Sequence, residues 1–194
     1  MEPSTPETPL APPVRPDPAG VRRHQAWPGV FGILMIAFGV IGILLVLWSV
    51  AATVWYLVAP NTVPAMLLPG ATLLPMWYHA VALGWSVLLF GVRVLEIAGG
   101  SGLLQRRAWG VRWARIWAWS HLAVTTLGTA WGLAMLPRTM QAAAQSTGGP
   151  MLPGTGAFAV LMSIVGWAIT VSLPVVLLVW LRRAESRAEI AEWR

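Results

Sequence analysis

The chain has 194 residues, of which 57% are hydrophobic and 10% are charged, with a formal net charge of +6. An ordinary soluble domain has about 25% charged residues, so the composition excludes a typical water-soluble globular domain. The absence of cysteine from the sequence excludes disulfides, thiolate zinc sites, iron–sulfur clusters and covalently attached haem. The basic excess does not predict nucleic-acid binding, because the arginines flank apolar segments, where membrane topology accounts for them.

Residues 1–26 form a proline-rich segment that also contains Glu, Thr, Asp and Arg. Such a segment buries too little apolar surface to offset the entropy lost on ordering. It also lacks the basic start and apolar stretch of a signal peptide. We therefore expect residues 1–26 to be a disordered tail.

Residues 27–182 carry the apolar segments that predict membrane insertion. No Asp, Glu, Lys or Arg occurs between Arg23 and Arg93, nor between Arg138 and Arg182. A helix needs about 20 predominantly apolar residues to cross a bilayer. The sequence therefore predicts a domain of four membrane-spanning helices, followed by a short charged tail at 183–194. The expected spans are about 30–58, 78–104, 109–136 and 156–181.

Prolines and glycines separate these helices. Several prolines fall within residues 60–77 and exclude a lipid-facing helix there. The third helix is expected to end at Pro137, where a loop rich in Gly, Ser and Thr begins; within this helix, Gly128 and Gly132 have the GxxxG spacing of close helix packing. Only a few residues join the second and third helices, so these should form an antiparallel hairpin. The predicted fold is all-α, an integral-membrane four-helix bundle with up-down-up-down topology.

Arginines set the predicted orientation. The loops on one side contain Arg138 alone, whereas the arginines expected to fix topology on the other side are Arg22, Arg23, Arg106, Arg107, Arg112, Arg115, Arg182 and Arg183. Cytoplasmic loops of membrane proteins carry an excess of Lys and Arg, so both termini are expected to be cytoplasmic. All thirteen basic residues are Arg, which is typical of GC-rich bacterial genomes. We therefore expect a multi-pass protein of the bacterial inner (cytoplasmic) membrane.

Four polar residues are expected to share one depth near the bilayer centre: Arg93, Glu96, His121 and Thr170. Arg93 lies roughly 16 Å from Leu104 by helix rise, and Glu96 follows one turn later, where an i, i+3 ion pair can form. Such a layer has two alternative interpretations. It can orient the helices through interhelical hydrogen bonds, or it can form a pathway for protons or anions.

The sequence shows no catalytic constellation. Glu96 is the only acidic residue within the apolar segments, and the motifs of metalloproteases, nucleophile elbows and phosphate-binding loops do not occur. His79 is expected at the outer end of the second helix, roughly 15–20 Å in depth from His121, which is too far for both to hold one haem iron. We therefore expect neither an enzyme activity nor a cofactor.

The segment from Gly91 to Ser120 reads GVRVLEIAGGSGLLQRRAWGVRWARIWAWS. It combines a Gly-rich helix end, a Leu pair, an Arg pair and an aromatic-x-x-Arg start to the next helix. This segment resembles small bacterial four-span integral membrane proteins of uncharacterised function, and the run from Pro174 to Arg183 is similar to their last span. The resemblance covers about a third of the chain; it implies a fold and no activity.

Two functional hypotheses follow from the sequence. The first is a non-catalytic structural or accessory component that contacts lipid, other membrane-protein subunits or a second copy of itself. The alternative is a small oligomeric transporter or channel-like protein that uses the Arg93–Glu96–His121 layer. A pathway would need these side chains in a hydrated cavity, whereas a structural role would need them buried between helices.

Overall fold

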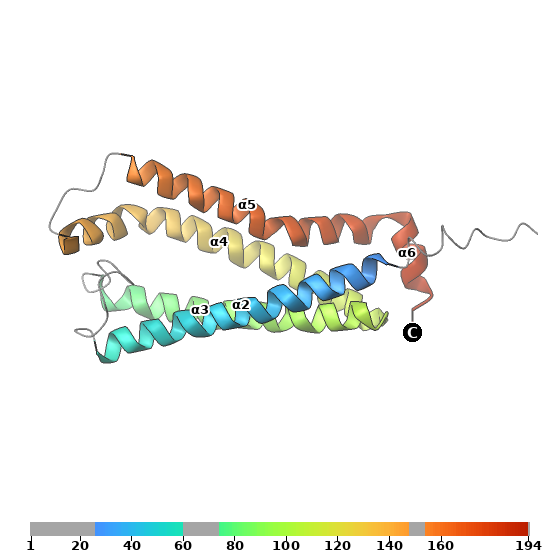
Figure 1. The fold of residues 1–194 in the computed structure, drawn as a ribbon. Helices are drawn as coiled ribbons and strands as arrows, with labels where there is room; N and C mark the ends of the chain where they lie inside the picture. The colour runs from blue at the N-terminus through green and yellow to red at the C-terminus, as the bar shows by residue number, and fades with distance from the viewer. Residues whose placement is uncertain (1–25, 60–73, 148–153, 194) are drawn as a thin grey trace, which may run out of the picture.

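The chain is helical almost throughout residues 26–59, 74–147 and 154–193, which are the residues that the computed structural model describes (Figure 1). Its elements are α2 (Trp27–Val58), α3 (Met76–Leu104), α4 (Ala108–Thr147), α5 (Thr155–Arg182) and α6 (Ala184–Ala191). No strand occurs in these ranges, which confirms the predicted all-α class there. The predictions for the tail, including Arg22 and Arg23, and for residues 60–73 and 148–153 fall outside the described residues.

Three of the described helices are long and apolar enough to cross a membrane. They are α2 over Trp27–Trp55, α3 and α5, and their most apolar windows have mean hydropathies of 3.0, 1.8 and 2.3. These helices identify the chain as a helical membrane protein, as its composition predicted. The helix α4 is not among the three. Its middle, between Arg115 and Arg138, has no charged residue, but Trp, Thr, Gly, Ser and His are interspersed there among the apolar residues and lower the mean hydropathy.

The four long helices run antiparallel in chain order, and each packs against the one before it (Figure 1). The ends of α2 and α5 approach each other near α6, where the ring centroids of Phe31 and Trp180 lie 5.5 Å apart. Away from α6, α2 and α5 make few contacts. The helices therefore form an open row over much of their length and come together mainly at the end of the molecule that carries α6.

The most densely packed core lies towards this same end. Its fully buried side chains include Met35 of α2, Leu103 of α3, Trp117 of α4 and Leu177 of α5. In contrast, nearly every side chain of α5 between residues 157 and 170 is exposed. The first half of α5 thus presents apolar side chains outward on most sides, as a helix surrounded by lipid does.

Glycines allow α2, α3 and α4 to approach closely. A Cβ added at Gly32 of α2 or at Gly100 of α3 would lie 2.8 Å from the other residue's carbonyl oxygen. At the α3–α4 turn, the backbones of Gly102 and Gly110 touch, so a Cβ on either would overlap the other chain segment. The glycines near the end of α3 therefore belong to the helix itself and allow α2 and α4 to pack closely against it. Small residues have this role in membrane helices, where apolar burial does not drive association.

The predicted GxxxG pair in α4 has a different environment. A Cβ at Gly128 would lie 2.9 Å from the indole nitrogen of Trp85, whereas a Cβ at Gly132 would meet no atom within 4 Å. Gly128 therefore makes room for a ring, and Gly132 takes no part in close packing within the described residues.

The prediction that the third helix ends at Pro137 is wrong, because α4 continues to Thr147. Pro137 removes one backbone donor, yet the residues that follow it include Met, Gln and three consecutive Ala, all good helix formers. The Thr139 hydroxyl also donates a hydrogen bond of 2.9 Å to the Leu136 carbonyl. Helix propensity after the proline therefore outweighs the single lost hydrogen bond.

The predicted charged tail at 183–194 contains a separate helix. Arg183 adopts an extended conformation with ψ of 141°, which ends α5 and starts α6 in a new direction. Ser186 is buried, and Ile190 and Trp193 pack against the core. The helix α6 therefore covers the end of the packed helices, where the sequence had predicted only a short charged tail.

Candidate functional site

An ion pair lies in the middle of α3. Nη1 of Arg93 donates a hydrogen bond of 2.7 Å to Oε2 of Glu96. The Glu96 side chain is 1% exposed and the Arg93 side chain is 20% exposed. The i, i+3 spacing thus forms the pair expected from the sequence, with its carboxylate enclosed by protein.

Arg93 reaches this position because α2 has no side chain in its way. The stem and guanidinium of Arg93 lie directly over Gly42, and a Cβ there would overlap Nε and Cδ of the arginine. Gly39, one turn earlier, faces the backbone of the same arginine. The arginine therefore runs between α2 and α3 and does not extend outward into lipid.

Two aromatic side chains of α4 complete the cluster from the opposite side. Trp117 and His121 are one turn apart, with ring centroids 5.3 Å from each other. Trp117 lies close to the Glu96 carboxylate, and His121 lies close to the Arg93 guanidinium. We refer to Arg93, Glu96, Trp117 and His121 as the polar cluster. It lies between α3 and α4, with α2 covering the arginine.

The polar cluster contains buried atoms that lack hydrogen bonds. Nε1 of Trp117 and both ring nitrogens of His121 have no partner of hydrogen-bond geometry among the described residues. The two residues are 0% and 4% exposed. The indole of Trp117 interacts with the Glu96 carboxylate without completing a hydrogen bond to it. Unpaired buried nitrogens are uncommon and call for a physical explanation.

The structure does not place the Thr170 side chain in this cluster, which corrects the predicted four-residue layer. Its hydroxyl donates to the carbonyls of Gly166 and Trp167 on its own helix, both at 2.9 Å, and the residue is exposed. Only the Thr170 backbone approaches His121. Equal depth along two helices does not fix the direction of a side chain, and threonine in a helix readily satisfies its hydroxyl on the preceding turn.

The sequence analysis missed Trp117 and Gly42 as members of this site. Trp117 precedes His121 by four residues, so helical periodicity places the two on one face. That spacing could have identified Trp117. No comparable signal marked Gly42, because its importance depends on which helix packs over Arg93.

The predicted topology-determining arginines gather at one end of the helices. Arg106 and Arg107 lie in the α3–α4 turn, Arg112 and Arg115 in the first turns of α4, and Arg182 and Arg183 at the end of α5. Arg138, on the far side, has its Cζ 6.0 Å from the ring centroid of Trp77. The antiparallel fold therefore separates the arginines into a rich end and a poor end (Figure 1).

Comparison with known proteins gives no relative from which a function can be transferred. No family model matches the chain, and neither a curated protein nor a solved structure matches it significantly. Among the described residues, no three His, Cys, Asp or Glu side chains gather closely enough to hold a metal ion. The function must therefore be argued from the arrangement of the chain itself.

Proposed function

We propose that the protein is a four-span component of the bacterial inner membrane, with both termini cytoplasmic, and that it has a structural or accessory role. In this proposal α4 also crosses the membrane, as the third span in chain order, in addition to the three apolar helices α2, α3 and α5. The reason is that α4 lies between α3 and α5 in the chain and is longer than either. The observation that carries the proposal is the enclosure of the polar cluster. Glu96 and His121 are 1% and 4% exposed, as expected for polar groups that fix helices against each other.

The outer surface of α5 is the candidate contact for a partner. We suggest a photo-crosslinking residue at Ile169 of α5, which is 67% exposed, and a matched one at Leu44 of α2, which is 62% exposed. An accessory role predicts a crosslink to one defined membrane protein, or to a second copy of the chain, from Ile169 in native membranes and a weaker one from Leu44. Lipid adducts alone at both positions would contradict a protein-contacting role.

A second candidate function, a small oligomeric proton or anion transporter, is favoured by one observation. The ring nitrogens of His121 are buried and unpaired beside Arg93 and Glu96. Buried ionisable groups within membrane helices are used in proton relays. In this alternative, the unpaired nitrogens would exchange protons when the helices open to water.

The two functions can be separated by one substitution. His121→Phe replaces the unpaired ring with an apolar ring of similar shape, which should leave thermal stability in detergent unchanged or raised. For the structural role, proton flux in liposomes should equal that of protein-free liposomes for both wild type and variant. Flux in the wild type that disappears in a well-folded His121→Phe protein would establish the transporter instead.

A further inference from the structure

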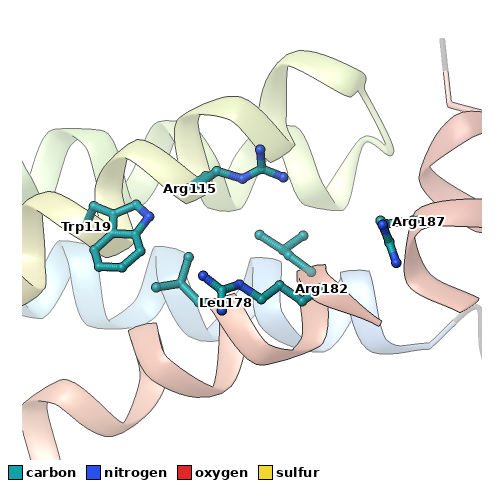
Figure 2. Close-up of a pocket in the computed structure, with 6 residues that line it drawn as sticks. Arg115, Trp119, Leu178, Arg182 and Arg187 are labelled. Atoms are coloured by element: carbon teal, nitrogen blue, oxygen red, sulfur yellow. The ribbon is translucent and has the colours of Figure 1, made fainter. Parts of the chain in front are cut away.

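A cavity lies between α4, α5 and α6 at the arginine-rich end of the molecule (Figure 2). Its volume is about 480 Å³, which falls in the range of roughly 300–1,000 Å³ that is typical of small-molecule sites. The residues that line it are Arg115, Trp119, Leu178, Leu181, Arg182 and Arg187. Three arginines from three different helices thus line one space together with three apolar residues.

Arg115 of α4, Arg182 of α5 and Arg187 of α6 form no ion pair with the described residues. No acidic residue lines the cavity, although α6 also carries Glu185 and Glu189. Figure 2 shows the Arg182 side chain running back along α5 towards Leu178. Arginines that only determine membrane topology must lie near the cytoplasmic side of the membrane. That role does not require them to line the same cavity. That three arginines line one cavity indicates a site for an anion.

Two of the apolar lining residues, Trp119 and Leu178, lie on the membrane side of the arginines. Trp119 follows Arg115 by one turn in α4, and Leu178 precedes Arg182 by one turn in α5. Because the two helices are antiparallel, both apolar residues lie about 6 Å deeper than their arginines. The backbone positions of the arginines therefore lie nearer the end of the helices than Trp119 and Leu178, while the Arg182 side chain reaches back beside Leu178 (Figure 2). A phospholipid offers matching groups, a phosphate for the guanidinium groups and acyl chains for Trp119 and Leu178.

We propose that this cavity binds the phosphate of an anionic phospholipid headgroup, with the acyl chains running along Trp119 and Leu178. The planar guanidinium group forms paired hydrogen bonds to phosphate oxygens, and basic pockets between membrane helices on the cytoplasmic side suit anionic headgroups. The proposal rests on the membrane insertion of α4 and α5 in the proposed function, and it names lipid as one specific partner of that protein.

The test measures lipid binding to the full-length protein by native mass spectrometry. The probes are phosphatidylglycerol and phosphatidylcholine, with glycerol 3-phosphate and inorganic phosphate as soluble anions. The variant R115Q/R187Q removes two cavity arginines, and the matched control R107Q/R112Q removes two exposed arginines at the same end. We expect the wild type to prefer phosphatidylglycerol, and R115Q/R187Q to bind it about tenfold or more weakly because charge-assisted hydrogen bonds are lost. The control should bind as the wild type does.

Equal weakening in both glutamine variants would overturn the proposal, because it would show a diffuse surface potential in place of a site. Soluble phosphate that binds as tightly as phosphatidylglycerol would overturn the lipid assignment. If R115Q/R187Q does not fold, R115K/R187K keeps the charge and loses the guanidinium geometry, so unchanged affinity in that variant would also contradict the proposal. Failure of the wild type to insert into nanodiscs would instead refute the proposed function, which separates the two failures.

Discussion

Glu96 is the residue whose buried environment places the strictest requirements on its neighbours. Its carboxylate is almost fully enclosed and has one hydrogen-bonded partner, Arg93. Removing a charge from water is costly, and removing one partner of a buried pair is more destabilising than replacing both with apolar residues. Arg93 in turn depends on Gly42, because a side chain at that position would occupy the space of its guanidinium. The stability of the polar cluster therefore depends on at least two helices.

Glu96→Gln should destabilise the protein by roughly 3–5 kcal/mol, because the partly buried Arg93 would remain between the helices without its counter-charge. The double substitution Arg93→Leu with Glu96→Leu should recover much of that loss. Both effects can be measured as midpoints of thermal unfolding in the same detergent.

The control for this experiment is Arg112→Leu, which removes an exposed arginine from α4 and should change stability little. If the double variant is as unstable as Glu96→Gln, the Arg93–Glu96 pair contributes to stability by more than the neutralisation of each charge by the other. A Glu96→Gln protein with wild-type stability would contradict the buried-pair interpretation.

At the scale of elements, α3 is the helix that holds α2 and α4 together. It packs against α2 and α4 with glycines at the points of closest approach, including Gly32 against Gly100 and Gly102 against Gly110. In a membrane, close backbone contact supplies the dispersion energy that apolar burial supplies in water. By contrast, α5 is joined to α4 with much of its surface exposed.

Gly110→Ala should be strongly destabilising, because its Cβ would overlap the backbone of Gly102, which no side-chain rotation can relieve. By analogy with overpacked cores we expect a loss of about 1–3 kcal/mol, measured by thermal unfolding in detergent. Gly84→Ala is the matched control within a helix, since its Cβ would meet no atom within 4 Å. That variant should be neutral or more stable, because alanine has the higher helix propensity. Equal stability of the two variants would refute the close contact.

For the whole molecule, the separation of charge between the two ends is the feature with the widest consequence. The starts of α2 and α4 and the ends of α3 and α5 share one end (Figure 1), and most arginines of the described residues lie there. In the orientation that we propose, that end faces the cytoplasm, because cytoplasmic loops carry an excess of Lys and Arg. The helix α6 covers the same end and contributes Arg187 to the cavity described above.

Reporter fusions test this orientation together with the number of spans. Fusions after Arg107 and after Arg194 should report a cytoplasmic location, and fusions after Asn61 and after Gly148 should report the opposite side. These results follow from four spans with the arginine-rich end inside. A cytoplasmic reporter after Gly148 would show that α4 does not cross the bilayer and would leave three spans.

The extent to which sequence predicted structure differs among these features. Long apolar segments and the spacing of arginines were sufficient to predict where α2, α3 and α5 lie in the sequence, because membrane insertion depends on the length and composition of a segment. The Arg93–Glu96 pair was predictable because it lies within one helix. The end of α4 was not predictable, because it depends on the local helix propensity after Pro137. The direction of the Thr170 side chain was not predictable either, because it depends on the rotation of α5 about its axis. The contacts of Gly42 required the packing of two helices.

The loose attachment of the first half of α5 has a consequence for membranes of different thickness. The close contacts of α2, α3 and α4 hold their mutual tilt, so these helices must respond to a thicker or thinner bilayer as one body. The helix α5 has 28 residues, or roughly 42 Å at the usual rise, and contains a proline at position 174 about which its inclination can change. Hydrophobic mismatch is relieved most readily by tilt. We therefore expect α5 to absorb a change in bilayer thickness while the glycine-packed helices keep their arrangement.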